Sequence, residues 1–127
     1  MATTGHTQNL RLVLPVTGEL VGEWGDIVNE GLTDLVDNAI AGTYELAMGD
    51  TNKTLTNLNG AADQARYMFI TATGALTANR EIICPSLSKL YFITNATSGG
   101  FSVTVKTSGG SGIDVPAGER MALYCNT

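Results

Sequence analysis

The fold is decided at residues 22–42, which read GEWGDIVNEGLTDLVDNAIAG, and at the change of pattern that follows them. In this stretch apolar residues recur at steps of three and four while acidic residues fill the other positions, as in an amphipathic helix. We predict one helix from about Gly22 to Ala41, with Gly42 as a left-handed C-terminal cap. Gly25 and Gly31 each cost about 1 kcal/mol relative to alanine inside a helix, so the helix depends on packing.

The helix carries a seam with the alternating a and d spacing by which helices of different copies pack together. Its members are Val28, Leu32, Leu35 and Ala39. The seam covers about two and a half heptads, fewer than the three or four that identify a coiled coil. Periodicity alone leaves two alternatives: packing against other copies of the chain, and packing against the chain's own sheet. Trp24 is expected to anchor the helix to that sheet.

After Gly42 the period changes from 3.6 to two, and short alternating segments are separated by Gly, Asn, Asp and Pro. The predicted strands are Tyr44–Met48, Thr54–Asn57, Tyr67–Thr73, Glu81–Cys84, Leu90–Asn95, Phe101–Lys106 and Arg120–Tyr124. One helical turn is expected at 61–66, and no internal repeat of 20–50 residues is recognised. Short strands with Gly-rich corners are typical of an antiparallel β-sandwich of the jelly-roll kind. The expected fold class is mainly β, with an N-terminal helix.

Composition excludes several functions. The chain has 127 residues, of which 43% are hydrophobic and 15% charged, against roughly 25% charged in ordinary soluble domains. The 7 Lys and Arg residues are scattered and the net charge is −5, which argues against nucleic-acid binding. No apolar run approaches the ~20 residues of a membrane-spanning helix, so membrane insertion is not expected. Residues 1–8 are polar and do not resemble a signal peptide.

Residues suited to catalysis or metal binding are few. His6 is the only histidine and lies in the N-terminal tail, so a nucleophilic Cys84 has no base held on a rigid element. Cys84 and Cys125 are too few for a zinc site, and both are read as small buried strand residues. A disulfide between them requires neighbouring strands, and the lack of an export signal argues against it. We expect no metal and no cofactor.

Paired carboxylates are the one catalytic arrangement that the composition permits, because glycosidases use two acids roughly 5–10 Å apart. Asp34 with Asp37, and Asp26 with Glu30, share a helix face. Such pairs usually form a solvated flank, so no catalytic residue is predicted. The aromatic residues on the strands could present a platform for sugars, although core packing is their ordinary role.

An ordered series of motifs extends over residues 12–126. It comprises Leu12–Pro15, Glu23–Gly25, Asn29–Leu32, Leu35–Gly42, Asn59–Arg66, Thr73–Arg80, Ser88–Tyr91, Asn95–Lys106, Val115–Gly118 and Tyr124–Asn126. This series resembles tail-fibre-like virion proteins of tailed bacteriophages, including cyanophages and other marine phages. The pair Glu30–Gly31 departs from the better helix formers usual there, which weakens the seam.

The resemblance implies a non-enzymatic structural protein of the virion, a homotrimeric tail-fibre or fibre-adaptor module that anchors a host-recognition appendage. It implies three parts: an attachment segment at 1–20 that contacts other virion proteins, an oligomerisation helix at 21–42, and a β-sandwich at 43–127. It also favours packing of the Val28, Leu32, Leu35 and Ala39 seam against other copies. Two alternatives remain open, namely a capsid-decoration or head-fibre protein and a module that binds host surface glycans.

Overall fold

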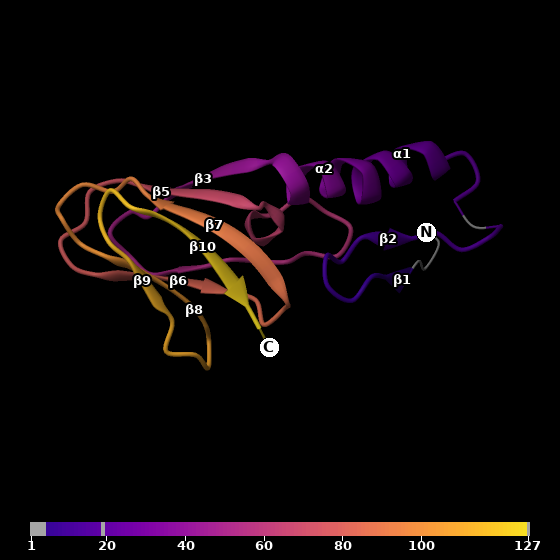
Figure 1. Cartoon of the computed structure of the whole chain (residues 1–127). Coiled ribbons are helices and arrows are strands. Elements are labelled where there is room, and N and C mark those ends of the chain that lie inside the picture. The colour runs from indigo at the N-terminus through magenta and orange to yellow at the C-terminus, as the bar shows by residue number, and fades with distance from the viewer. Residues whose placement is uncertain (1–4, 19, 127) are drawn as a thin grey trace.

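The chain forms one long helix that leads into two stacked sheets, with a small hairpin beneath the helix (Figure 1). The computed structural model describes residues 5–18 and 20–126. Residues 1–4 and 19 of the expected attachment segment, and residue 127 of the expected β-sandwich, therefore lie outside the described residues. The mainly β class and the single N-terminal helix are confirmed within this part of the chain.

The elements follow one another in a simple order. The helical segments are α1 (Trp24–Val28), the π-helix η1 (Asn29–Thr33), α2 (Asp34–Ala41) and the 3-10 helix η2 (Gln64–Arg66). The strands are β1 (Gly5–His6), β2 (Val13–Leu14), β3 (Thr43–Ala47), β4 (Lys53–Thr54), β5 (Phe69–Thr73), β6 (Arg80–Cys84), β7 (Lys89–Asn95), β8 (Val103–Thr107), β9 (Ile113–Val115) and β10 (Arg120–Cys125). Each predicted strand overlaps an observed one, while β1, β2 and β9 were not predicted as strands.

The helix ends differently from its prediction. Gly42 adopts φ −75° and ψ 143°, an extended conformation that feeds the chain directly into β3, so the left-handed cap is wrong. A Cβ atom at Gly42 would lie 2.7 Å from the backbone of Asn38 and 2.8 Å from the ring of Tyr67. Glycine is required here by close approach rather than by a positive φ.

The helix is seated on the β1–β2 hairpin through Gly31, which is buried in η1. A Cβ atom at Gly31 would lie 2.5 Å from Cγ2 of Val13, so the helix backbone touches that side chain directly. Residues spaced by four drift by about 40° per step around an α-helix. The wider turn of η1, with its i→i+5 hydrogen bonds, offsets part of this drift and helps Gly31, Leu35 and Ala39 to share the buried side.

We expect opposite effects from alanine at two helix glycines. Gly31→Ala should destabilise the chain by about 1–3 kcal/mol because the new methyl group overlaps Val13. Gly25→Ala, with nothing within 4 Å of its Cβ, should stabilise it by up to about 1 kcal/mol. Urea denaturation of the two variants checks this pair. Equal stability of both would show that the helix does not rest on the hairpin.

The eight strands after the helix form two four-stranded sheets, in the orders β10-β7-β5-β3 and β4-β6-β8-β9. From β3 to β8, each successive strand lies in the sheet opposite its predecessor. Because the chain returns to the same sheet after crossing the other one, neighbouring strands run in the same direction. Thus β3–β5, β5–β7, β4–β6 and β6–β8 are parallel, and only β7–β10 and β8–β9 are antiparallel in these two sheets.

The expected antiparallel jelly-roll sandwich is therefore wrong in its strand directions. The prediction took the Gly-rich corners as hairpin turns, whereas most of them carry the chain across to the other sheet. Two sheets do enclose one core, but they are mixed and mostly parallel, and the chain winds around that core in successive coils.

Two of the coils repeat with a constant offset, although no repeat was recognised in the sequence. The first coil is offset differently, since Thr43 pairs with Phe69 and Lys53 with Ile82, 26 and 29 residues apart. In β5–β7, Phe69 pairs with Phe92, and in β6–β8, Arg80 pairs with Val103, each 23 residues apart. The isolated bridge between Ala75 and Ser98 has the same offset. The tripeptide Phe-Ile-Thr recurs accordingly at 69–71 and 92–94. Two consecutive coils are thus stacked in register over both sheets and one corner.

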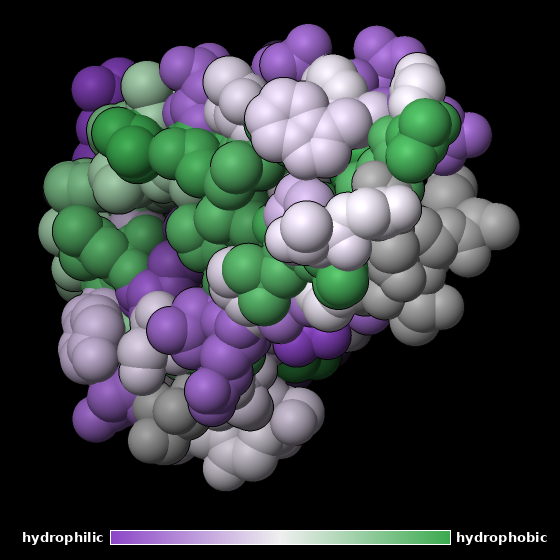
Figure 2. Space-filling model, turned by 90° about the vertical axis from the view of Figure 1, so that its right-hand side faces the viewer, coloured by the Kyte–Doolittle hydropathy of each residue, from purple (hydrophilic) through white to green (hydrophobic). Residues whose placement is uncertain are grey.

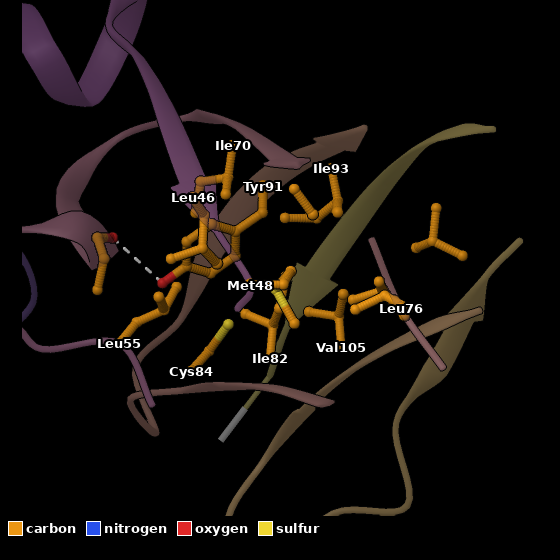
Figure 3. Close-up of a cluster of buried hydrophobic side chains, with 14 residues drawn as sticks. Leu46, Met48, Leu55, Ile70, Leu76, Ile82, Cys84, Tyr91, Ile93 and Val105 are labelled. Carbon is orange, nitrogen blue, oxygen red and sulfur yellow. Dashed lines mark hydrogen bonds between the residues drawn. The ribbon is translucent and has the colours of Figure 1, made fainter. Parts of the chain in front are cut away.

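The core lies between the sheets and consists of their inward-facing side chains (Figure 3). Its buried members are Leu46, Met48, Leu55, Ala65, Ile70, Ala72, Leu76, Ile82, Cys84, Tyr91, Ile93, Val103, Val105 and Val115. The hydroxyl of Tyr91 donates a hydrogen bond to the carbonyl oxygen of Ala65 at 3.2 Å, so the one phenol of the core is paired. The predicted burial of Cys84 is confirmed, and Cys125 is half-buried.

Two polar groups are buried at opposite ends of the coils. At one end, the side chains of Asp63 and Arg66 are each 1% exposed and hold the loop at 58–61. At the other, the fully buried side chain of Asn95 joins β7 to the segments around Phe101 and Val115. Both add side-chain hydrogen bonds that hold a corner of the coils.

Candidate assembly interface

The predicted helix seam is divided by the fold. Leu35 and Ala39 are 1% and 6% exposed and are buried inside the single chain. Val28 and Leu32 are half-buried. Two members of the seam are therefore buried within the single chain, and contact of the helix with other copies stays a prediction.

An apolar flank of the helix, adjoining its buried side, remains uncovered. Its residues are spaced by four, and they are Trp24, Val28, Leu32, Val36 and Ile40. Trp24 is 58% exposed and Ile40 is 64% exposed, while the three residues between them are half-buried. The expectation that Trp24 anchors the helix to the sheet is wrong, because the helix starts far from the sheets, above the hairpin (Figure 1). We call these five residues the helix flank.

A second apolar surface lies on the outer face of the β10-β7-β5-β3 sheet. Phe69 of β5 pairs with Phe92 of β7, and because parallel partners point to the same side, their rings stack with centroids 5.1 Å apart. Leu90 and Tyr124, which pair between β7 and β10, are 40% and 66% exposed. We call these four residues the sheet face.

The helix flank and the sheet face approach each other where α2 runs into β3. Ile40 lies three residues before Thr43, the first residue of β3, and Thr43 pairs with Phe69. The amide of Phe69 donates a hydrogen bond to the carbonyl of Gly42 at 3.3 Å. Figure 2 looks at the end of the molecule where the helix begins. Hydrophobic side chains gather there over the left and centre of the view, with hydrophilic ones above and below.

Charges are arranged around this surface rather than in it. The acidic residues Asp26, Asp34 and Asp37 are exposed on the helix but occupy positions outside the helix flank. On the outer side of the same sheet, the charged residues Glu45 and Arg120 belong to the two edge strands, β3 and β10. The centre of the surface is thus free of formal charge, which is the pattern of an interface core with a polar rim.

The four acidic residues considered for catalysis are all exposed. Glu30, Asp34 and Asp37 line one hollow of about 460 Å³ beside the loop at 60–62, and Asp26 is not among its lining residues. Among residues 5–18 and 20–126, no three His, Cys, Asp or Glu residues are grouped so that they could hold a metal ion. No helix in the described part of the chain is long and apolar enough to cross a membrane.

The sheet face is the part of the candidate interface that sequence reasoning did not single out. Strand alternation shows that Phe69 and Ile70 point to opposite sides, but it does not say which side is the core. The repeated Phe-Ile-Thr at 69–71 and 92–94 is the signal from which the stacking of the two phenylalanines could have been predicted. Of the aromatic residues considered for a sugar platform, Tyr91 is buried, whereas Phe69, Phe92 and Tyr124 point outward.

Comparison of the chain with protein-family models, with curated proteins and with solved structures finds no match.

Proposed function

We propose that this chain is a non-enzymatic structural module that assembles with copies of itself, in a phage virion appendage such as a tail fibre or fibre adaptor. The observation that carries the proposal is the uncharged apolar surface formed by the helix flank and the sheet face. The resemblance of residues 12–126 to tail-fibre-like virion proteins supplies the setting, with attachment to other virion proteins through residues 1–20.

The size of the surface supports self-association. From their exposed fractions and a side-chain area of about 150–250 Å² for the aromatic members, these residues expose roughly 700 Å². The largest apolar patch on an ordinary monomer is about 300–600 Å². A stable interface buries about 800 Å² on each partner. In a flank-to-sheet ring each contact covers only one of the two surfaces on each partner, so the polar rim must supply about half of each interface.

The homotrimer that the resemblance implies can be built from these two surfaces. A contact between the helix flank of one copy and the sheet face of the next is heterologous when a third copy, rather than the same partner, covers the remaining surface. Such contacts either close into rings or continue as filaments, and a homotrimer is the smallest ring of this kind. We propose the homotrimer.

The test is the mass of the free protein in solution, measured by sedimentation at low micromolar concentration. We expect a trimer for the natural chain, and a loss of association of at least about 100-fold for Phe92→Glu, as for a charge placed at a hot spot. Ile113→Glu is the matched control, because Ile113 is 52% exposed but lies in the other sheet. It should leave the trimer intact.

A second variant protects this test against simple unfolding. Phe92 stacks on Phe69, so its replacement also weakens the fold, whereas the side chain of Ile40 is 64% exposed at the end of α2. Ile40→Glu should dissociate the trimer while keeping the melting temperature of the monomer. A natural chain that is monomeric at these concentrations, or a trimer unaffected by both variants, overturns the proposal.

A glycan-binding module is the second candidate, favoured by the stacked rings of Phe69 and Phe92 and by the hydroxyl groups of Thr71 and Thr94 beside them on the same face. Exposed aromatic rings next to hydrogen-bonding groups suit the apolar faces of sugars. A glycan array probed with the natural chain and with Phe92→Glu separates the candidates, because assembly alone predicts no bound glycan. Labelling the protein on intact particles distinguishes a tail location from a capsid-decorating one.

A further inference from the structure

The two cysteines of the chain meet at one cavity although they belong to different sheets. Cys84 is the last residue of β6 and Cys125 is the last residue of β10, and both point inward between the sheets. Both line a cavity of about 410 Å³ that opens at this end of the coils. The sequence argument required neighbouring strands for a disulfide, but the turn from β6 to β7 brings the two sheets together here.

The local contacts place the Cys125 thiol beside the backbone that follows Cys84. The thiol of Cys125 donates a weak hydrogen bond to the carbonyl oxygen of Pro85 at 3.8 Å, and Pro85 directly follows Cys84. Cys125 also pairs across the ladder with Lys89, which closes the short turn after Cys84. In Figure 3, Cys84 points into the core from the edge near which β10 ends.

We propose that Cys84 and Cys125 form an intrachain disulfide when the protein meets a disulfide oxidant such as oxidised glutathione. The bond links the two sheets at the rim of the cavity and closes a loop of 42 residues, from Cys84 to Cys125. The inference stands on the single chain and does not depend on the proposed assembly.

The reaction has a fixed order because the two thiols differ in access. The half-exposed Cys125 thiolate attacks the oxidised glutathione, which forms a mixed disulfide and releases one glutathione. Cys84 then loses its proton and attacks the Cys125 sulfur, releasing the second glutathione. Two protein thiols and one oxidised glutathione thus give one protein disulfide and two reduced glutathione molecules.

The second step controls the rate. Burial raises the pKa of Cys84 to about 12, and the neighbouring Cys125 adds to the shift while the Lys89 ammonium opposes it. Burial also lowers the pKa of Lys89 to about 8, and its ammonium lies 4.0 Å from the ring centre of Tyr91. Since only the Cys84 thiolate reacts, we expect ring closure within the chain to be slow at neutral pH and to accelerate above pH 8.

The experiment treats the full chain with oxidised glutathione at pH 8 and follows intact mass and free thiols without denaturant. We expect the natural chain to lose two hydrogens, to hold no glutathione at the end, and to melt about 5–10 °C higher than the reduced chain. Cys84→Ser should stop at one glutathione on Cys125, and Cys125→Ser should retain a free buried thiol.

Two outcomes overturn the proposal. If the natural chain accumulates the Cys125 glutathione adduct while Cys84 stays free, the two sulfur atoms are too far apart in the fold. If oxidation yields chains joined to each other, seen on gels without reductant, then Cys125 reacts between molecules instead. Loss of the trimer has no bearing on either result.

Discussion

Asn95→Ala should destabilise the chain by about 3–5 kcal/mol, a large share of the 5–15 kcal/mol by which ordinary domains are stable. The amide nitrogen of Asn95 donates to the carbonyls of Phe101 and Val115 at 3.1 and 2.8 Å. Its oxygen accepts from the amide and the hydroxyl of Thr97 at 3.2 and 2.5 Å. Because the side chain is fully buried, these partners lose their hydrogen bonds without gaining water.

Denaturation in urea measures this loss of unfolding free energy. In a thermal scan we expect the melting temperature to fall by about 10–20 °C. Asn79→Ala is the matched control, since Asn79 is exposed and accepts a single hydrogen bond from the amide of Ser102 at 3.0 Å. That variant should cost no more than about 1 kcal/mol. If the two asparagine variants are equally stable, Asn95 does not hold the end of β7 to the neighbouring coil.

Arg66→Met should cost about 3–5 kcal/mol, as expected when one partner of a buried ion pair is removed. The guanidinium of Arg66 donates to the carbonyls of Leu58 and Ala61 at 2.5 and 3.1 Å, and its Nε lies 3.8 Å from a carboxylate oxygen of Asp63. Without it, the Asp63 carboxylate remains buried with no cation beside it. The amide of Leu58 would be its one remaining hydrogen-bond donor among these groups.

A double-mutant cycle and a pH series test this account. Asp63→Asn removes the charge but keeps an acceptor for the amide of Leu58. The double variant should therefore lose less free energy of unfolding than the sum of the losses in the two single variants. Burial raises the pKa of Asp63 above its ordinary value of 3.8, despite the opposing effect of Arg66. The folded chain then binds the proton more tightly than the unfolded chain, so this group lowers stability as pH rises from about 4.

The deficit of Arg66→Met should therefore shrink when urea denaturation is repeated near pH 4, because the raised pKa of Asp63 leaves more of the buried carboxyl protonated there than at pH 7. A deficit that is equal at pH 4 and pH 7 would mean that Arg66 contributes by packing alone.

The helix and most strands follow from the sequence because their signals are local. The 3.6-residue period from Trp24 to Ala41 and the alternation along β5 to β8 each depend on a few neighbouring residues. Strand direction is not local in this sense. Gly99, with φ 108°, packs so tightly on the carbonyl of Leu76 that a Cβ would lie 2.2 Å from it, and this stacks one corner on the next. Nothing in a Gly-rich turn distinguishes such a crossing from a hairpin.

The candidate interface could be predicted only in part, because it too depends on contacts between residues far apart in the sequence. The period identified the apolar residues of the helix, but it did not separate the residues that rest on Val13 from those left uncovered. That division depends on η1, whose wider turn helps to bring Leu35 and Ala39 to the buried side of the helix. The sheet face needed the register between β5 and β7, which joins residues from different coils.

The shared 23-residue offset of the β5–β7 and β6–β8 pairs suggests that the chain could be lengthened by whole coils. Each coil contributes one strand to each sheet, and neighbouring strands lie about 4.8 Å apart. Inserting 23 residues with the inward pattern of Ile70, Ile82 and Ala72 would extend both sheets by one strand while leaving both end structures in place. The same insertion would add one more exposed ring to the stack of Phe69 and Phe92. Adding a coil would therefore lengthen the core and the outer row of aromatic rings together.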